Sequence, residues 1–509
     1  MGFVLSGILH LPGAKLTTDG EACEHGKAGK SQIFWCTLGL LRNRCGQALQ
    51  SVQIISRRAR EEGCGCRVPC SSSAQEPPWS VAAVILGDGS GTKLYPLTKR
   101  RAGGAIPLAA HYRLIDVVVS NCINSNITKI YALTQFNSTS LNAHLSRAYS
   151  TVGLGKDGFV EVLAAYQNLD DEGWFQGDAD SIRRCLWVLE EYPVEDFLVL
   201  PGHHLYRMEY EKLIKAHRDS NADITVVLSL SENQRRPYSS SLKLNSKDQT
   251  LDSRRKLEGA QAPLMTTGGG SFTTDGAQDL RSMGIYVIKR EALGKLLLQN
   301  LPHATDFKSE VIPGAVSMGM KVHTYTFNGY WEDMRDVEAF YQANLGITRK
   351  APTSQGFNFY DREHPIYTLA RCLPPTRITG AAIKDSVIGD GCVLNRCKIN
   401  GSVIGMRACI GDGAIVEDTI VMGADIYQID EDFRWCMTKK PCAAVPLGIG
   451  EQTQVRRAII DKNARIGKNV KIVNADNVQE GDREESGYII TGGIVVVLKG
   501  AVIPDGSII

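Results

Sequence analysis

The sequence has no long hydrophobic run and almost no net charge. Its densest apolar stretches, Val81–Leu86 and Ile494–Leu498, are only as long as strands, whereas a membrane-spanning helix needs roughly 18 apolar residues. The 57 basic and 55 acidic side chains leave a formal charge of +2, so no global field attracts the chain to nucleic acid or to an anionic membrane. We therefore expect neither a nucleic-acid partner nor a membrane partner.

The sequence also lacks a clear disulfide or zinc framework. Six of its fourteen cysteines lie in the first 70 residues and the others are scattered, a distribution typical of reduced, buried cysteines. Cys64, Cys66 and Cys70 could form a metal or redox cluster, but no second pair or nearby histidine completes a zinc set. We expect Cys392, Cys397 and Cys409 to fill the interior or the turns of their domain.

Residues 1–78 contain no long apolar core of the kind found in secretory signals. The first 60 residues carry eight Lys or Arg and three acidic residues. A basic, acid-poor leader of this kind favours an organellar transit peptide, of the plastid type, that ends between Cys70 and Pro78. A disordered tail or a mispredicted gene start would give the same composition.

The middle of the chain has the pattern of an α/β domain. At 509 residues with 43% apolar side chains, the chain is long enough for two or three domains. Continuous apolar runs separated by helical stretches predict a parallel sheet that is covered on both faces, over residues 79–347. The runs are Val81–Leu86, Ile130–Leu133, Phe197–Leu200, Ile224–Leu228 and Ile285–Ile288, and Tyr210–His217 is predicted to be a covering helix with His217 exposed.

The C-terminal part follows a different periodicity. A linker over residues 348–376 contains four prolines, and beyond it apolar residues recur every five or six positions. Such short repeats bury a face only when they are stacked, so they predict a parallel β-helix over residues 377–509 with one inward apolar residue per side. The inward positions are predicted to be Ile388, Leu394, Ile399, Ile404, Ile410, Ile415, Ile420, Ile449, Ile460 and Ile466, with an insertion near 427–446.

A glycine-rich turn follows the first predicted strand. It contains Gly87, Gly89 and Gly91, followed by Thr92 and Lys93. Backbone N–H groups in such a turn can bind phosphates. The turn lacks the Walker ending and the Rossmann spacing, so taken alone it could equally be only a tight turn.

Several long motifs show what this turn belongs to. The turn and the following Leu94-Tyr95-Pro96-Leu97-Thr98 resemble the nucleotide-binding signature of sugar-1-phosphate nucleotidyltransferases. Across nearly the whole chain from residue 80, the sequence resembles ADP-glucose pyrophosphorylase, and its motifs are similar to those of the plant small subunit. The motifs are Tyr112–Asp116, Leu133–Ser138, Gly158–Leu163, Trp174–Gly177, His204–Met208, Ser282–Gly284, Tyr330–Asp333 and Ile460–Gly467.

The resemblance implies an enzyme that joins ATP and glucose 1-phosphate to give ADP-glucose and pyrophosphate, in the plastid, for starch synthesis. It implies a Rossmann-like domain followed by a left-handed β-helix, and a heterotetramer of small and large subunits. It also implies Mg²⁺ as cofactor, a phosphorylated sugar acid as activator and phosphate as inhibitor.

The resemblance assigns roles to particular residues. Asp333 would hold the metal, with Lys93 and position 203 as the other catalytic positions. Nucleotide would contact Gly87, Gly89, Gly91, Thr92, Gln135 and Gly177, while sugar phosphate would contact Glu161, Lys256 and Ser282. Effectors would bind Arg100, Arg101, Arg113, Lys462 and Lys499. Trp174 and Phe175 are expected in the core or in a pocket wall.

The chain departs from the family pattern at the expected catalytic site. His203 stands where the family has a metal-binding aspartate, and imidazole is a poor ligand for magnesium. Gly103-Gly104 replaces a phosphate-binding Lys-Pro, and Asp88 places a carboxylate in the phosphate loop. Lys93 replaces an arginine, Asp178 a threonine and Arg335 a glycine, and Lys256 is only a tentative counterpart of the sugar-phosphate lysine.

Three hypotheses remain open from the sequence. The chain is a working adenylyltransferase, a catalytically silent regulatory or structural subunit, or the product of a decaying gene. His203 and Gly103 favour the silent subunit for this chain's own turnover, because the metal ligand and a phosphate-binding cation are both missing.

Overall fold

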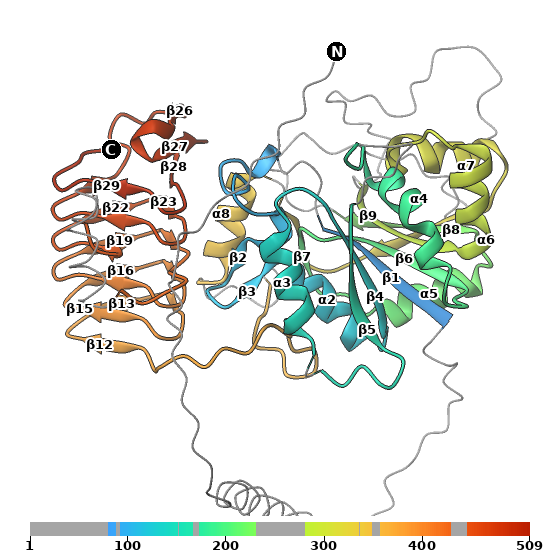
Figure 1. Ribbon diagram of the computed structural model, residues 1–509, viewed down its shortest axis with the longest axis horizontal. Helices are drawn as coiled ribbons and strands as arrows, with labels where there is room; N and C mark the ends of the chain where they lie inside the picture. Colours follow the sequence, from blue (N-terminus) through green and yellow to red (C-terminus); the bar gives the residue numbers. More distant parts are fainter. Residues whose placement is uncertain are drawn as a thin grey trace, which may run out of the picture. The chain divides into compact units, whose positions relative to one another are not determined.

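The computed structural model describes residues 80–87, 92–150, 152–165, 173–230, 280–334, 336–348, 357–428 and 445–509. Within one compact unit, residues 76–509, an α/β region is followed by a coil of short strands (Figure 1). Among the described residues, no helix has both the length and the apolar character needed to cross a membrane.

A seven-stranded sheet forms the α/β region. Its strands are β1 (Val81–Leu86), β4 (Lys129–Thr134), β5 (Phe159–Ala164), β6 (Asp196–Pro201), β8 (Ile224–Leu230), β9 (Leu280–Lys289) and β10 (Val322–Phe327). They lie in the order β10-β8-β9-β6-β1-β4-β5. Five of these strands were expected from the apolar runs, and each run lies within the strand that the structure forms.

The direction of one strand differs from the prediction. β9 runs antiparallel to both β6 and β8, whereas the other neighbouring pairs are parallel. A continuous apolar run shows that a strand is buried on both faces, and this burial does not depend on the strand's direction.

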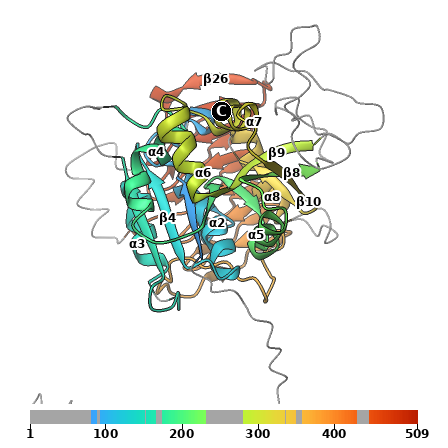
Figure 2. The same ribbon diagram turned by 90° about the vertical axis from the view of Figure 1, so that its right-hand side faces the viewer.

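Helices cover both faces of the sheet (Figures 1 and 2). Successive side chains of β1 alternate between two cores, because side chains of a strand point to opposite faces. Ala82 and Val84 pack in the core beneath α4 (Asp178–Leu189), α6 (Arg290–Gly294) and α7 (Ile312–Ser317). Val81, Ala83 and Ile85 pack in the core beneath α2 (Leu114–Asn124), α3 (Thr139–Ala148) and α5 (Tyr210–Asp219).

The exposure of His217 on helix α5 differs from the sequence prediction. Tyr210, Leu213 and His217 follow one another at helical spacing and are all buried, so His217 is not the exposed residue that we expected. Its Nδ1 lies 2.8 Å from the Thr225 hydroxyl on β8, and its Nε2 lies 3.5 Å from an Asp196 oxygen on β6. These polar partners make burial of the imidazole tolerable.

Shorter elements complete the α/β region. β7 (His204–Tyr206) pairs antiparallel with β11 (Trp331–Asp333), and β2 (Pro107–Leu108) pairs with β3 (Tyr112–Arg113). The remaining elements are η2 (Thr92–Leu94), η3 (Gly103–Ala105), η5 (Lys295–Asn300), η6 (Phe307–Val311) and α8 (Val337–Gly346).

The C-terminal region is a three-sided parallel β-helix, shown in orange to red in Figure 1. One side contains β12 (Arg377–Thr379), β15 (Val393–Asn395), β18 (Cys409–Ile410), β21 (Gly448–Ile449), β24 (Arg465–Ile466) and β29 (Val502–Ile503). The second contains β13 (Ala382–Lys384), β16 (Lys398–Asn400), β19 (Ile415–Glu417), β22 (Gln454–Arg456) and β25 (Lys471–Ile472). The third contains β14 (Val387–Ile388), β17 (Val403–Ile404), β20 (Ile420–Val421), β23 (Ala458–Ile460), β28 (Ile494–Val497), β27 (Tyr488–Thr491) and β26 (Glu480–Arg483), with η8 (Glu484–Ser486) between the last two along the chain.

The interior of the β-helix agrees with the predicted repeat except at two positions. Leu394, Ile410 and Ile466 stack in its core as expected. On two sides of one turn of the coil, the inward residue is Val416 (β19) or Val421 (β20), one position after the predicted Ile415 and Ile420. Ile420 instead packs with residues of α8. Both members of each pair are apolar, so the spacing alone could not decide between them.

Apolar packing and polar contacts join the β-helix and the linker to the α/β region within residues 76–509. Phe340 and Tyr341 of α8 share a buried apolar cluster with Met422 and Val496. The described part of the linker is held against α2, since the Thr368 hydroxyl donates to an Asp116 oxygen at 2.6 Å. The same buried carboxylate lies 2.5 Å from both the His144 Nε2 and the Tyr149 hydroxyl.

Candidate functional site

The ends of three parallel strands meet at one edge of the sheet. β1 lies between β4 and β6, so the residues that follow these strands converge, as ligand-binding residues do in α/β proteins. Gly87 N donates to the Leu133 carbonyl at 2.8 Å, and Gly202 N donates to the Leu86 carbonyl at 2.9 Å. Gln135 and His203 follow β4 and β6, and so lie at the same edge.

Two glycines allow this close approach. A β-carbon on Gly87 would lie 2.5 Å from the Leu133 oxygen, and one on Gly202 would lie 2.6 Å from the Leu86 oxygen. Real β-carbons do not come this close to backbone atoms, so only glycine fits at these two positions. At this edge the backbone of neighbouring strands therefore approaches too closely for any side chain at these two positions.

Part of the expected nucleotide site lies outside the described residues. These positions are Asp88, Gly89, Gly91, the side chain of Lys93, Lys256 and Arg335, together with the leader and its Cys64, Cys66 and Cys70. Thr92 is described, begins η2 and is exposed.

The turn that replaces the family's Lys-Pro lies next to Gly87. Gly103 and Gly104 are buried in η3, and a β-carbon on Gly104 would lie 3.6 Å from the Gly87 oxygen. Position 104, where the resemblance places the proline, thus lies near Gly87, and this chain offers no side-chain cation at position 103 or 104.

The catalytic position of His203 faces the other expected metal ligand. β7 and β11 pair so that Asp333 stands opposite His204, and Met334 N donates to the His203 carbonyl at 3.3 Å. The Nε2 atoms of His203 and His204 each lie 3.5 Å from the Asp333 Oδ1. The side chains of His203, His204 and Asp333 are 14%, 4% and 22% exposed, so the group is shielded but reachable.

The donor set of this group does not fit Mg²⁺. Magnesium prefers oxygen ligands in an octahedron, and the three side chains offer two imidazoles and one carboxylate. The structure therefore brings together the two positions that the resemblance assigns to a metal, and one of them, His203, has the wrong chemistry for Mg²⁺.

Gly177 and Asp178 lie at the start of helix α4. Gly177 is the residue before the helix, and the Asp178 Oδ1 accepts from Ala179 N at 2.8 Å and from Phe307 N at 2.9 Å. Burial, and next the charge of Asp306, raise the pKa of Asp178 to about 6. The carboxyl that replaces a threonine here is thus anchored to the backbone.

The expected aromatic neighbours separate into one buried and one exposed residue. Phe175 is buried, whereas Trp174 is 54% exposed, so Trp174 is not the core residue that we allowed for. It meets the exposed Phe136 edge-on with ring centres 6.1 Å apart. Phe136 directly follows Gln135, so the pair lies beside the nucleotide position.

The described sugar-phosphate candidates are not brought together. Glu161 is exposed on the edge strand β5, whereas Ser282 is buried on β9. Three strands, β4, β1 and β6, lie between them. The Ser282 hydroxyl accepts from Gly284 N at 3.3 Å, so it is held within its own strand.

Three effector candidates do lie in one electrostatic group. We call it the cationic cluster: Arg113, Arg371, Arg407, Lys462 and Lys499, with Asp425 among them. Burial lowers the pKa of Lys462, the charge and hydrogen bond of Asp425 oppose this shift, and the charges of Arg371 and Arg113 add to it. Burial alone would raise the pKa of Asp425, but Lys462, at 2.6 Å, and Lys499 lower it to about 2. A cluster of this kind suits a phosphorylated anion.

Arg100 and Arg101 are placed differently. Arg100 is exposed. The Nη2 of Arg101 bonds to both carboxylate oxygens of Asp461, and the two side chains are 4% and 3% exposed. Since Asp461 occupies this guanidinium, we leave Arg101 out of the cationic cluster and assign it to the contact between the two regions.

Sequence reasoning missed Arg371, Arg407 and Asp425 in the cluster, and His204 beside Asp333. None of them belongs to a periodic pattern, since Arg371 lies in the proline-rich linker and Asp425 follows a rung of the β-helix. The one usable signal was the doublet His203-His204 at the end of a predicted strand.

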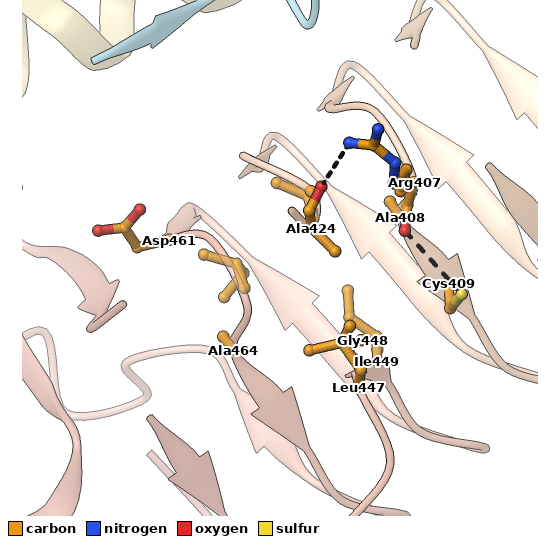
Figure 3. A pocket seen from close by; sticks show the side chains of 12 residues that line it. Arg407, Ala408, Cys409, Ala424, Leu447, Gly448, Ile449, Asp461 and Ala464 are labelled. Carbon is orange, nitrogen blue, oxygen red and sulfur yellow. Dashed lines mark hydrogen bonds between the residues drawn. The ribbon is translucent and has the colours of Figure 1, made fainter. Parts of the chain in front are cut away.

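A cavity within the β-helix is too small for a substrate. It measures about 20 Å³ and lies among residues that include Arg407, Cys409, Ile449 and Ala464 (Figure 3). This volume suits a single water molecule. In Figure 3 the Asp461 carboxylate points away from the other labelled residues, in keeping with its bond to Arg101.

The fold and the sheet edge define a class, a nucleotidyl transferase joined to a β-helix. The family of nucleotidyl transferases matches residues 82–350, and the GLGC left-handed parallel β-helix domain matches residues 371–508. An Arabidopsis thaliana protein named "Inactive glucose-1-phosphate adenylyltransferase small subunit 2, chloroplastic" is 54% identical over 432 residues, which cover 84% of this chain and 89% of that protein. A Triticum aestivum protein named "Glucose-1-phosphate adenylyltransferase small subunit, chloroplastic/amyloplastic" is 51% identical over 437 residues, 84% of this chain and 91% of that protein. The chain belongs to the glucose-1-phosphate adenylyltransferase small-subunit family.

Proposed function

We propose that this chain is a plastid subunit of ADP-glucose pyrophosphorylase that does not turn over by itself. In the assembly, ATP and glucose 1-phosphate give ADP-glucose and pyrophosphate for starch synthesis, and active partner subunits perform the reaction. This chain contributes its β-helix and its effector site. The observation that carries the proposal is His203, whose imidazole lies 3.5 Å from Asp333 where a second carboxylate would be needed.

The loss of catalysis follows from charge. In phosphoryl and nucleotidyl transfer the protein mainly positions the groups and neutralises the charge that develops on the phosphates. His203 removes one carboxylate from the expected metal site, and Gly103 removes the cation expected at that position of the turn. Each loss is of the kind that lowers the rate by about 10² or more.

The retained parts support a regulatory role. The cationic cluster combines Arg113 from β3 with Lys462 and Lys499 from the β-helix. We propose that it binds the phosphorylated sugar acid that activates the assembly, or the phosphate that inhibits it. The partners would be other subunits of a heterotetramer.

The proposal is tested by a variant that regains the aspartate at position 203 and the lysine at position 103. We expect His203→Asp combined with Gly103→Lys to raise pyrophosphate release by about tenfold or more over the parent chain. The matched control is His111→Gln, which changes a histidine beside a different carboxylate, Asp390. Equal activity of the parent and the double variant, both correctly folded and each assayed without any other subunit, would count against the proposal.

The alternative is that the chain is a working adenylyltransferase. The wheat relative's name, which carries no "inactive", favours this reading for the family. Steady ADP-glucose synthesis by the unmodified chain alone would establish it.

A further inference from the structure

The group of His203, His204 and Asp333 does not suit Mg²⁺, but it suits other divalent ions. We propose that His203, His204 and Asp333 bind a divalent transition-metal ion, such as Zn²⁺ or Co²⁺, in preference to Mg²⁺. The inference concerns metal binding alone and holds whether or not the chain turns over.

The chemistry of the three side chains favours a transition-metal ion over Mg²⁺. Two imidazoles and one carboxylate are a ligand set typical of zinc and of other borderline divalent ions. Magnesium gives up its water for oxygen ligands only reluctantly and gains little from imidazole. One ligand atom from each of the three side chains lies within 4.8 Å of the other two.

The distances between the ligand atoms support the same preference. Zinc bonds of 2.0–2.1 Å at tetrahedral angles place neighbouring ligand atoms about 3.3 Å apart. Octahedral magnesium, with bonds of similar length at right angles, places them about 2.9 Å apart. The Asp333 Oδ1 lies 3.5 Å from the Nε2 of each histidine, so two of the three separations already approach those of a zinc site.

The backbone holds the group in place. His204 and Asp333 are register partners in the β7–β11 pair, and the carbonyl of His203 accepts from Met334 N. Ligands on paired strands are more precisely placed than ligands on loops, so little ordering is needed when an ion binds.

Trp331 affects metal binding through its hydrogen bond to His204. Its indole Nε1 donates to the His204 Nδ1 at 3.3 Å. An indole N–H can only donate, so in the neutral ring the proton of His204 is on Nε2 and points towards Asp333. For a metal ion to bind Nε2, this proton must move to Nδ1 and the bond from Trp331 must break. Trp331 therefore weakens metal binding by His204.

The experiment is a metal titration of the full-length chain with its thiols alkylated, so that cysteines do not compete. Calorimetry with Zn²⁺ and Mg²⁺, and visible absorption with Co²⁺, give affinity and coordination. We expect one Zn²⁺ per chain, bound about 100-fold more tightly than Mg²⁺. His203→Ala should weaken Zn²⁺ binding about tenfold or more, whereas His111→Gln should leave it unchanged, since the carboxylate beside His111 is Asp390, at 3.7 Å, and not Asp333.

Two further variants decide the ligand set. His203→Asp should shift the preference towards Mg²⁺, and it keeps the proposal testable if His203→Ala does not fold. Trp331→Phe should tighten Zn²⁺ binding, because it frees the His204 ring to change tautomer. Equal Zn²⁺ affinity of the parent, His203→Ala and His203→Asp would overturn the site, and unchanged affinity in Trp331→Phe would remove His204 from it.

Discussion

A single imidazole changes the chemistry of the sheet edge in this chain. His203 follows β6 (Asp196–Pro201) beside Gly202, and tight backbone contacts at Gly202 and Gly87 hold this edge. The surrounding frame does not need a carboxylate at position 203 in order to fold, because these contacts involve backbone only. Function at this position can therefore be lost while the fold is kept.

The carboxyl of Asp178 predicts a pH effect at the residue scale. Its pKa of about 6 is raised above an ordinary value near 4. Between these values the folded chain binds more protons at this group than the unfolded chain does, so the free energy of unfolding falls as the pH rises from about 4 to about 6. Above that window the penalty is fully present.

We therefore expect Asp178→Asn to stabilise the chain at pH 7 by about 1–2 kcal/mol. The amide oxygen can still accept from the N–H groups of Ala179 and Phe307. Urea unfolding at several pH values measures the difference, which should shrink towards pH 4. The exposed Asp219→Asn is the control, and a pH-independent gain in Asp178→Asn would contradict the assigned cause.

At the scale of elements, apolar patterning predicted where strands lie but not how they are directed. The runs at β1, β4, β6, β8 and β9 were all found, because burial on both faces requires continuous apolar residues. The antiparallel direction of β9 leaves no trace in the run itself, because burial on both faces is the same for either direction.

The same limit applies to the β-helix and to the site. The repeat predicted the coil, but at Ile420-Val421 the partner surface of α8 decides which residue faces inward. The motifs predicted Asp333 and position 203, whereas the contribution of His204 depends on the register of β7 and β11. Register between distant strands cannot be seen in a single sequence.

The rungs of the β-helix give a prediction at this scale. Ile466 is fully buried within the coil, while Ile378 on the terminal rung of the same side is 51% exposed. We expect Ile466→Ala to lower the free energy of unfolding by about 2–5 kcal/mol, since it leaves a cavity in a packed core. Ile378→Ala should change it by less than about 1 kcal/mol. Similar losses in the two variants, measured by urea unfolding, would contradict the assigned interior.

At the scale of the whole molecule, the buried pair Arg101–Asp461 joins the α/β region to the β-helix. Removing one partner leaves the other charge buried without compensation, which costs about 3–5 kcal/mol. We expect Arg101→Ala and Asp461→Ala each to show such a loss in chemical unfolding, and the double variant to lose less than the sum.

The control for this cycle is the exposed pair Arg396–Asp412, whose arginine is 71% exposed. Arg396→Ala should change stability by about 0–1 kcal/mol. Additive losses at Arg101 and Asp461 would show that the pair does not act as a unit.

The cationic cluster gives the second prediction at this scale, because its members come from both regions. Lys462→Ala removes a cation and leaves the Asp425 carboxylate without its 2.6 Å partner. We expect the affinity for inorganic phosphate to fall about tenfold, measured by calorimetry. Lys398→Ala, an exposed lysine on β16, should bind phosphate as the parent does, and an equal loss in both variants would contradict a specific site.

The most direct measurement is pyrophosphate release by the purified, unmodified chain with Mg²⁺, ATP and glucose 1-phosphate and no other subunit present. We predict no release above that of a protein-free control, because His203 replaces the second carboxylate and Gly103 replaces a phosphate-binding cation. Sustained release that scales with protein concentration and yields ADP-glucose would contradict it.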